Sequence, residues 1–121
     1  MVNVKDGLAQ LMDTEGCLGC CIVDSNSGMI LGAAGGGAVN IELAAAGNTE
    51  VLRAERKTIK LLGLGDAIED ILITMGRQYH VFRPLAKNDA LFVYVVLDKA
   101  KANLAMARHR VGAVEKELTI A

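Results

Sequence analysis

The 121-residue sequence has few aromatic side chains and no excess of charge of either sign. Aromatic residues make up 3% of the chain, with no tryptophan, against 52% apolar residues, so we expect an aliphatic core. Thirteen Lys and Arg stand against fourteen Asp and Glu, which gives a net charge of −1. Because nucleic acids and anionic membranes attract a basic surface, this balance argues against either as a partner.

Long apolar runs are also missing. No stretch approaches the roughly 20 residues that a membrane-spanning helix needs. The mixed, polar segment 1–10 does not have the pattern of a signal peptide. A chain of this length is large enough for one hydrophobic core. We therefore expect one soluble domain, 1–121, located in the cytoplasm.

The three cysteines cluster, and their odd number without a secretory signal disfavours a disulfide framework. Cys17 and Cys20 form a C-x-x-C motif, next to Cys21. On a regular strand, Cys17 and Cys21 would face one way and Cys20 the other. His80 and His109 complete no zinc spacing. We expect buried, unreactive cysteines, with no metal and no cofactor.

No catalytic motif is apparent. The glycine-rich segment 32–37 lies between a strand and a helix, as phosphate-binding loops do, but it lacks their lysine and fits neither glycine pattern. Neither histidine has a Ser or Cys partner at a spacing typical of a nucleophile–base pair. We expect a protein that is not an enzyme.

Hydrophobic periodicity and turn residues divide the chain into eight elements. Helices are expected over 3–13, 41–64 and 99–119, and strands over 17–23, 29–33, 68–75, 78–85 and 91–97. Asn40 and Asp98 are the expected N-caps of the last two helices. Gly76-Arg77 suits a type II′ turn between the third and fourth strands.

The order α-β-β-α-β-β-β-α indicates an α/β fold of the α+β type. Segments 17–23 and 91–97 are nearly continuous apolar runs, which is typical of strands buried on both faces. We therefore expect a five-stranded antiparallel sheet with these two in its interior and helices on both sides. Asp66, Glu69 and Asp70 precede the third strand and are expected in a solvated turn, with Asp70 discouraging stray pairing at an edge.

The helix expected over 41–64 has three faces, and two of them are apolar. The first apolar stripe comprises Ile41, Ala44, Ala45, Val51, Leu52, Ile59 and Leu62. A second, the small-residue stripe, comprises Leu43, Ala46, Gly47, Ala54 and Leu61. A surface helix of a monomer needs only one apolar stripe, so the second suggests that another body packs there.

Polar residues lie between the two stripes. This polar strip comprises Glu42, Thr49, Arg53, Arg56 and Lys60, and it is either a solvated face or the surface that meets an acidic patch on a partner. Asn48 and Glu55 fall within the first apolar stripe, where buried polar groups need hydrogen-bonding partners. They lie either at its margin or, as we prefer, at a subunit interface that supplies those partners.

Five stretches together resemble the bacterial roadblock family, of the roadblock/dynein light-chain group. They are DSNSGMILG (24–32), ELAAAGNTEVLRAERKT (42–58), IEDILIT (68–74), YHVFRPL (79–85) and LFVYVVLDKAKANLAMAR (91–108). The resemblance covers nearly the whole chain in the same element order, and no catalytic motif belongs to it.

The resemblance implies a small cytosolic protein whose sheet has one helix on one face and two on the other. It implies a homodimer formed through the third strand and the long helix of each copy. The residues then expected near the two-fold axis are Leu43, Gly47, Ala54, Leu61, Ile68, Asp70, Leu72 and Thr74. Family members bind or regulate Ras-like small GTPases, and eukaryotic members are subunits of dynein and of nutrient-signalling scaffolds.

The expected function is therefore that of a non-catalytic homodimer that binds a Ras-like small GTPase and stimulates its GTP hydrolysis. The resemblance supplies no GTPase-contact motif, so helix geometry alone assigns the polar strip to that partner. A scaffold subunit with no effect on nucleotide turnover is the alternative. A small-ligand sensor is a third alternative. It is the weakest, because the sequence shows no set of convergent polar residues that would suggest a pocket.

Overall fold

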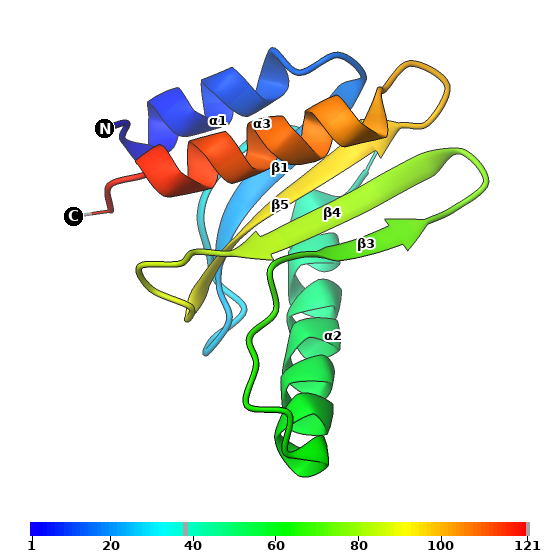
Figure 1. Ribbon diagram of the computed structural model, residues 1–121. Helices are drawn as coiled ribbons and strands as arrows, with labels where there is room; N and C mark the ends of the chain where they lie inside the picture. Colours follow the sequence, from blue (N-terminus) through cyan, green and yellow to red (C-terminus); the bar gives the residue numbers. More distant parts are fainter. Residues whose placement is uncertain (38, 121) are drawn as a thin grey trace.

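The computed structural model describes residues 1–37 and 39–120. The predicted order of elements is confirmed (Figure 1). The elements are α1 (Val4–Met12), β1 (Cys17–Asp24), β2 (Ile30–Gly35), α2 (Ile41–Leu62), β3 (Ile71–Thr74), β4 (Gln78–Pro84), β5 (Leu91–Asp98) and α3 (Leu104–Glu117). Within the described ranges, no helix is both long and apolar enough to cross a membrane.

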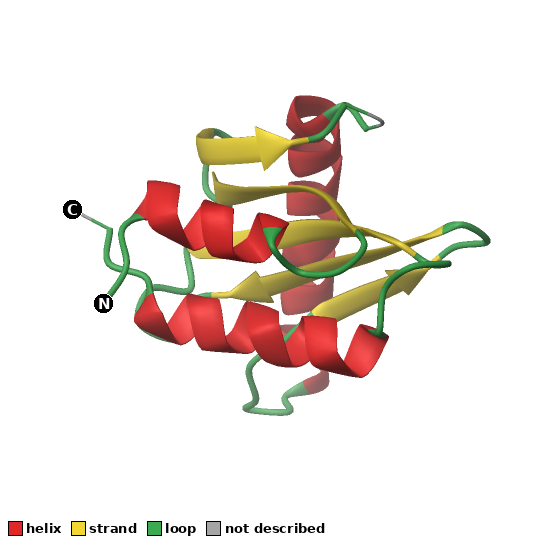
Figure 2. Ribbon diagram, turned by 90° about the horizontal axis from the view of Figure 1, so that it is seen from above, coloured by secondary structure: helices red, strands yellow, loops and turns green. Residues whose placement is uncertain are grey.

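The five strands form one antiparallel sheet in the order β2-β1-β5-β4-β3. Strand β5 lies at its centre with Leu91–Leu97 all buried, and β1 lies beside it, so the two strands expected in the interior do lie there. Helices α1 and α3 lie side by side on one face and α2 covers the other (Figure 2). This confirms the expected arrangement of layers.

The sheet separates two hydrophobic cores of different character. On the α1/α3 side the core is aliphatic, as expected, with Leu11, Val93 and Val111 among its buried residues. On the α2 side three of the four aromatic side chains gather. Phe82, Phe92 and Tyr94 are buried there, and the Phe82 ring centre lies 6.0 Å from that of Phe92 and 5.9 Å from that of Tyr94. The expectation of an aliphatic core therefore holds for one face only.

The last helix begins at Leu104, so the predicted start at 99 was wrong. Asp98 accepts a hydrogen bond from the Ala100 amide (3.0 Å), and the amides of Lys101 and Ala102 bond to the Asp98 carbonyl. These bonds close a turn that brings the chain back over the sheet. The side chain of Asn103 is the actual N-cap and accepts from the Met106 amide at 3.1 Å.

The segment before β3 is largely irregular, and β3 is shorter than the predicted 68–75. Gly63 ends α2 in the left-handed conformation (φ 65°), as a C-cap glycine commonly does. The two-residue link Gly76-Arg77 is present, closed by the Met75 amide bonding to the Gln78 carbonyl at 2.9 Å. Gly76 has no positive φ, which a type II′ turn requires at that position, so the predicted turn type was wrong.

A bulge in β1 overturns the predicted orientation of the cysteines. The β1–β5 register shifts between Cys17 and Gly19, so Leu18 is an extra residue with no partner on β5. This places Cys17 on the α1/α3 side together with Cys20, while Cys21 lies on the α2 side. Cys20 and Cys21 are fully buried, and Cys17 is partly exposed.

Candidate functional site

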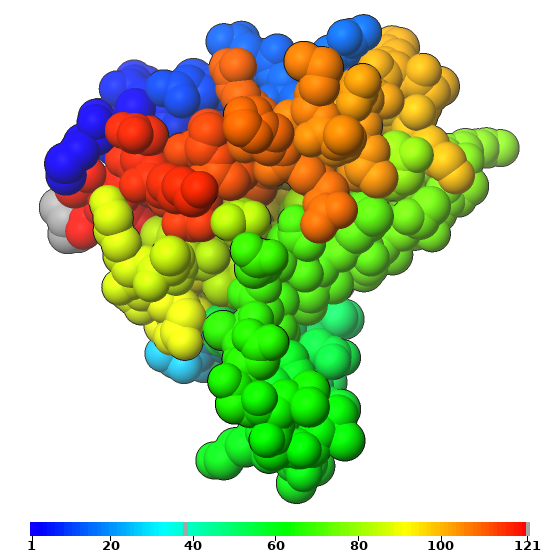
Figure 3. Space-filling model, in the orientation of Figure 1, coloured from blue at the N-terminus to red at the C-terminus, as the bar shows by residue number. Residues whose placement is uncertain are grey.

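Helix α2 begins on the sheet and then leaves it. The Asn40 side chain accepts from the Leu43 amide (3.1 Å), which confirms the predicted N-cap. The buried residues of this 22-residue helix are Ile41, Ala45, Thr49 and Leu52. The last of them, Leu52, lies just past the midpoint of the helix. The rest projects past the edge of the sheet as an arm (Figures 1 and 3). At 1.5 Å per residue, the whole helix is about 33 Å long, more than the sheet can cover.

The small-residue stripe of α2 has no cover in the single chain. Leu43 and Leu61 are 70% and 77% exposed, and Ala46, Gly47 and Ala54 are also exposed. A Cβ atom built on Gly47 would have no atom within 4 Å. The first apolar stripe reaches the sheet only as far as Leu52, and Leu62 and Leu64 at the tip of the arm are 66% and 61% exposed. These residues form one apolar surface that the chain itself leaves open.

Strand β3 presents an unpaired edge near this helix. Because the Met75 amide bonds to the Gln78 carbonyl, alternation along an antiparallel ladder places Ile73 and Ile71 in hydrogen-bonded pairs with β4. The backbone groups of Leu72 and Thr74 therefore point away from the sheet. Ile68, Ile71 and Ile73 pack against the α2-side core. The open edge thus borders the face of the sheet that α2 covers.

The polar strip of α2 does not form one solvated row. Glu42 and Lys60 are exposed, but Thr49 is 1% exposed, because it faces the sheet and its hydroxyl donates to the Ala45 carbonyl at 2.7 Å. Arg53 and Arg56 both turn toward their own chain. Of the five residues assigned to a partner, only Glu42 and Lys60 are both exposed and free of hydrogen bonds from their side chains to other described residues.

The two arginines of α2 hold two turns of the sheet. Arg53 donates from Nε to the Ser25 carbonyl (2.8 Å) and from its guanidinium to the Asn26 carbonyl, both in the β1–β2 turn. Arg56 bonds to the Ser25 hydroxyl (3.3 Å) and to the Asp89 carbonyl in the β4–β5 turn. These contacts span 27 to 33 residues of sequence, so no local pattern could have shown them.

Comparison with known proteins rests on structure alone. No family model matches the sequence, and no curated protein matches it. Among solved structures, the roadblock/LC7 domain from Streptomyces avermitilis superposes with a TM-score of 0.81 at 8% identity, over 96% of this chain and 94% of that one. MglB of Myxococcus xanthus gives 0.81 at 16% identity, over 94% and 89%. The chain has a roadblock fold.

A further similar structure is MglB in a tetrameric arrangement. It superposes with a TM-score of 0.69 at 14% identity and covers 94% of this chain and 88% of that one. At such identities the likeness concerns the fold only.

Asn48, a polar residue of the first apolar stripe, lies beside the buried Tyr94 hydroxyl. Burial raises the pKa of Tyr94, and the neighbouring Asn48 amide opposes that increase. The Tyr94 hydroxyl also meets His80 Nδ1, and His80 Nε2 lies 2.9 Å from Gln78 Oε1. Burial lowers the pKa of His80. Glu55, the other polar residue of that stripe, is exposed.

Asp70 is held by α3. Arg108 binds its carboxylate through two hydrogen bonds, from Nε at 3.0 Å and from an η nitrogen at 2.8 Å. The prediction of a solvated Asp70 guarding the sheet edge was therefore wrong, since its side chain is 13% exposed and its charge is paired. Asp66 and Glu69 are exposed, as predicted.

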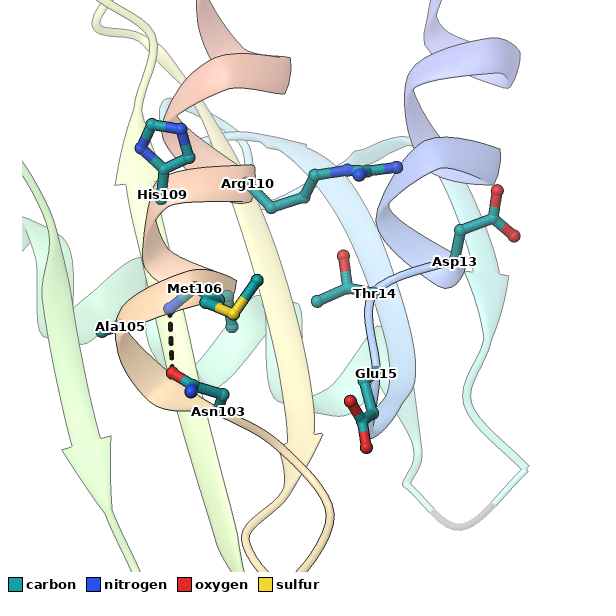
Figure 4. Close-up of a pocket in the computed structure, with 9 residues that line it drawn as sticks. Asp13, Thr14, Glu15, Asn103, Ala105, Met106, His109 and Arg110 are labelled. Carbon is teal, nitrogen blue, oxygen red and sulfur yellow. Dashed lines mark hydrogen bonds between the residues drawn. The ribbon is translucent and has the colours of Figure 1, made fainter.

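A cleft on the opposite face lies where α1 and α3 diverge (Figure 4). Its volume is about 470 Å³, and it is lined by Asp13, Thr14 and Glu15 after α1 and by the first two turns of α3. Arg110 reaches toward α1 and bonds to the Gln10 carbonyl (3.4 Å), while Met106 is 70% exposed beside the cleft. None of the predicted site residues lies here, because the cleft depends on how two distant helices pack.

Proposed function

We propose that this chain forms a homodimer through α2 and β3, and that the dimer regulates a Ras-like small GTPase without catalysis of its own. The observation that carries the proposal is that the single chain leaves two surfaces open. Helix α2 exposes Leu43, Leu61 and Leu62, with Leu64 just after it, and β3 offers an unpaired backbone edge.

Both surfaces are satisfied at once by a second copy. Antiparallel pairing of two β3 edges would continue the sheet across a two-fold axis and supply partners for the Leu72 and Thr74 backbone groups. The same axis would bring the two small-residue stripes together, where Ala46, Gly47 and Ala54 allow a close approach of the backbones. Exposed apolar patches of this kind mark interaction sites on soluble proteins.

The GTPase would bind the platform formed by the paired helices. Within the polar strip, Glu42 and Lys60 are the available charged contacts, whereas Arg53 and Arg56 support the surface by fixing the two neighbouring turns. Thr49 can act only through the helix, because it is buried. A rigid platform that holds a switch region of the partner in its hydrolysis-competent arrangement would speed GTP hydrolysis without donating a residue.

Dimerisation is tested by filling the small-residue stripe. Gly47→Trp and Ala54→Trp place a bulky side chain in open space of the single chain, so each variant should fold but fail to dimerise. Light scattering after gel filtration should give the monomer mass for both and the dimer mass for the parent. Ala113→Trp, at an exposed position of α3, is the matched control. Dimers of undiminished stability in the two α2 variants would refute the interface.

The partner is tested by capture from the lysate of the source organism, once with a non-hydrolysable GTP analogue and once with GDP. Retention of a small GTPase only with the analogue, with faster hydrolysis on mixing, supports the proposal. A combined Glu42→Lys and Lys60→Glu variant should lose both effects while remaining dimeric. Equal retention with either nucleotide, without faster hydrolysis, would favour the scaffold function, and failure to bind any small GTPase would exclude the regulator.

A further inference from the structure

Three sulfur atoms meet where α1 ends and β1 begins. The bulge at Leu18 turns the Cys17 side chain to the same face as Cys20, so the two thiols are neighbours on that face. The Cys17 sulfur also lies 3.7 Å from the Met12 sulfur, at the last residue of α1. This cluster is independent of α2, β3 and the proposed partner.

The surroundings keep the cluster compact. Cys20 is fully buried, and its thiol donates to the Leu8 carbonyl at 3.6 Å. Gly35 of β2 lies against Met12, since a Cβ atom built there would come within 3.0 Å of the Met12 sulfur and 2.7 Å of its methyl carbon. A side chain at position 35 would therefore displace the thioether. Cys17 is partly exposed, which leaves a route from solvent to the sulfurs.

We propose that Met12, Cys17 and Cys20 form a site for a soft monovalent metal ion, with Cu(I) as the ion it fits. Two thiolates and a thioether are the ligands that Cu(I) prefers, and Zn(II) would lack a fourth ligand here. Trigonal coordination with metal–sulfur bonds of about 2.3 Å places the sulfurs about 4 Å apart. The Met12–Cys17 separation of 3.7 Å already approaches this spacing.

The binding step displaces protons and involves no oxidation. Cu(I) replaces the protons of the two thiols, forms two copper–thiolate bonds and one copper–thioether bond, and releases two protons to solvent. Affinity should therefore rise with pH. Because the ligands come from both α1 and β1, the bound ion would join the end of the helix to the sheet and increase the melting temperature.

The test is an anaerobic titration of the reduced protein with Cu(I) supplied as its bicinchoninate complex. The protein should withdraw one equivalent of Cu(I), which is measured by the loss of the coloured complex, and its melting temperature should rise. Cys17→Ser and Cys20→Ala should each abolish the transfer, and Met12→Leu, which keeps the volume, should weaken it. Cys21→Ala, on the opposite face of the sheet, should leave it unchanged.

Failure of the parent protein to withdraw Cu(I) from the chelator would overturn the site. Undiminished transfer of Cu(I) to Cys17→Ser would also overturn it. Because Cys17 is partly exposed, this variant is the one expected to fold most safely. Cu(I) binding that needs Cys21 would place the ion elsewhere. None of these outcomes bears on the dimer or the GTPase, which rest on α2 and β3.

Discussion

Leu18 is the residue at which β1 departs from a regular ladder, and the departure changes the chemistry of its neighbours. The neighbouring Cys20 thiol lowers the Cys17 pKa. Burial raises the pKa of Cys21 to about 12, and the contact with Cys17 together with burial raises that of Cys20. The expectation of three unreactive cysteines therefore gives way to a prediction of one reactive thiol.

We predict that Cys17 alkylates before Cys20 and Cys21 in the metal-free native protein. The thiolate is the reactive form, and Cys17 combines the lowered pKa with partial exposure. Iodoacetamide labelling near pH 7.5 (a value below the usual thiol pKa of about 8.5), followed by peptide mass spectrometry, should show a single early modification at Cys17. In denaturant the alkylation rates of the three cysteines should converge. Early labelling of Cys21 instead would contradict the assignment of faces.

His80 makes stability depend on pH. Burial lowers its pKa in the folded state, so the unfolded chain binds the proton more readily. The neutral ring therefore contributes stability above its ordinary pKa of about 6.5, and this contribution is lost as the pH falls below that value. The neutral ring also accepts from the Tyr94 hydroxyl at Nδ1 and donates from Nε2 to Gln78.

We predict that His80→Gln reduces the loss of stability between pH 7 and pH 5. Urea midpoints for the parent and the variant should converge as the pH is lowered. His109→Gln, at an exposed position of α3, should retain the full dependence of the parent. A difference in urea midpoint between the parent and His80→Gln that stays constant from pH 7 to pH 5 would show that folding does not change the pKa of His80.

At the scale of elements, α3 is fastened to the sheet by one buried ion pair. Glu115 is 2% exposed and accepts from Arg83 Nε on β4 at 2.9 Å and from the Ala86 amide at 3.2 Å. Its carboxylate therefore satisfies a guanidinium and a backbone donor together. The two partners of the pair are 32 residues apart, which is why neither stood out in the sequence.

We predict that Glu115→Ala lowers the free energy of unfolding by roughly 3 kcal/mol, because it leaves a poorly solvated cation without its counter-ion. Glu117→Ala, two residues along the same helix, removes a largely exposed carboxylate that pairs with the N-terminus and should cost less than about 0.5 kcal/mol. Urea denaturation measures both. Equal costs would mean that the Arg83–Glu115 pair contributes no more than a surface contact.

At the scale of the whole molecule, the α2 arm is the feature that one chain leaves incomplete. Its tip carries exposed leucines far from either hydrophobic core, so the arm gains little from its own sheet (Figure 3). If a second copy covers it, folding and association are linked. Stability should then depend on protein concentration, since anything that binds only the folded state stabilises it.

We predict that the melting temperature rises with protein concentration, and that the Leu61→Ser, Leu64→Ser double variant loses this rise. Scanning calorimetry over a hundredfold range of concentration provides the measurement. Met106→Ser removes an equally exposed apolar side chain from α3 and should leave the concentration dependence intact. A melting temperature independent of concentration for the parent chain would argue that the arm is uncovered in solution.

The sequence by itself determined which segments are helices and strands, because those depend on local patterns. Apolar runs predicted the interior strands β1 and β5, Asn40 predicted the start of α2, and the second apolar stripe of α2 predicted an uncovered surface. Local cues misled where two competed, as at Asp98 and Asn103, where each residue is a good cap and the turn between them decided which one begins α3.

The tertiary structure alone decided which side chains meet. The bulge at Leu18 depends on pairing with β5, the turns held by Arg53 and Arg56 depend on how α2 crosses the sheet, and Asp70 depends on α3 for its counter-ion. These contacts join residues that are distant in the chain, so their energies appear only once the chain is packed. The predicted first apolar stripe of α2 therefore matches the buried residues only where the helix lies on the sheet. The predicted polar strip was incomplete, because the partners of its residues lie on other elements.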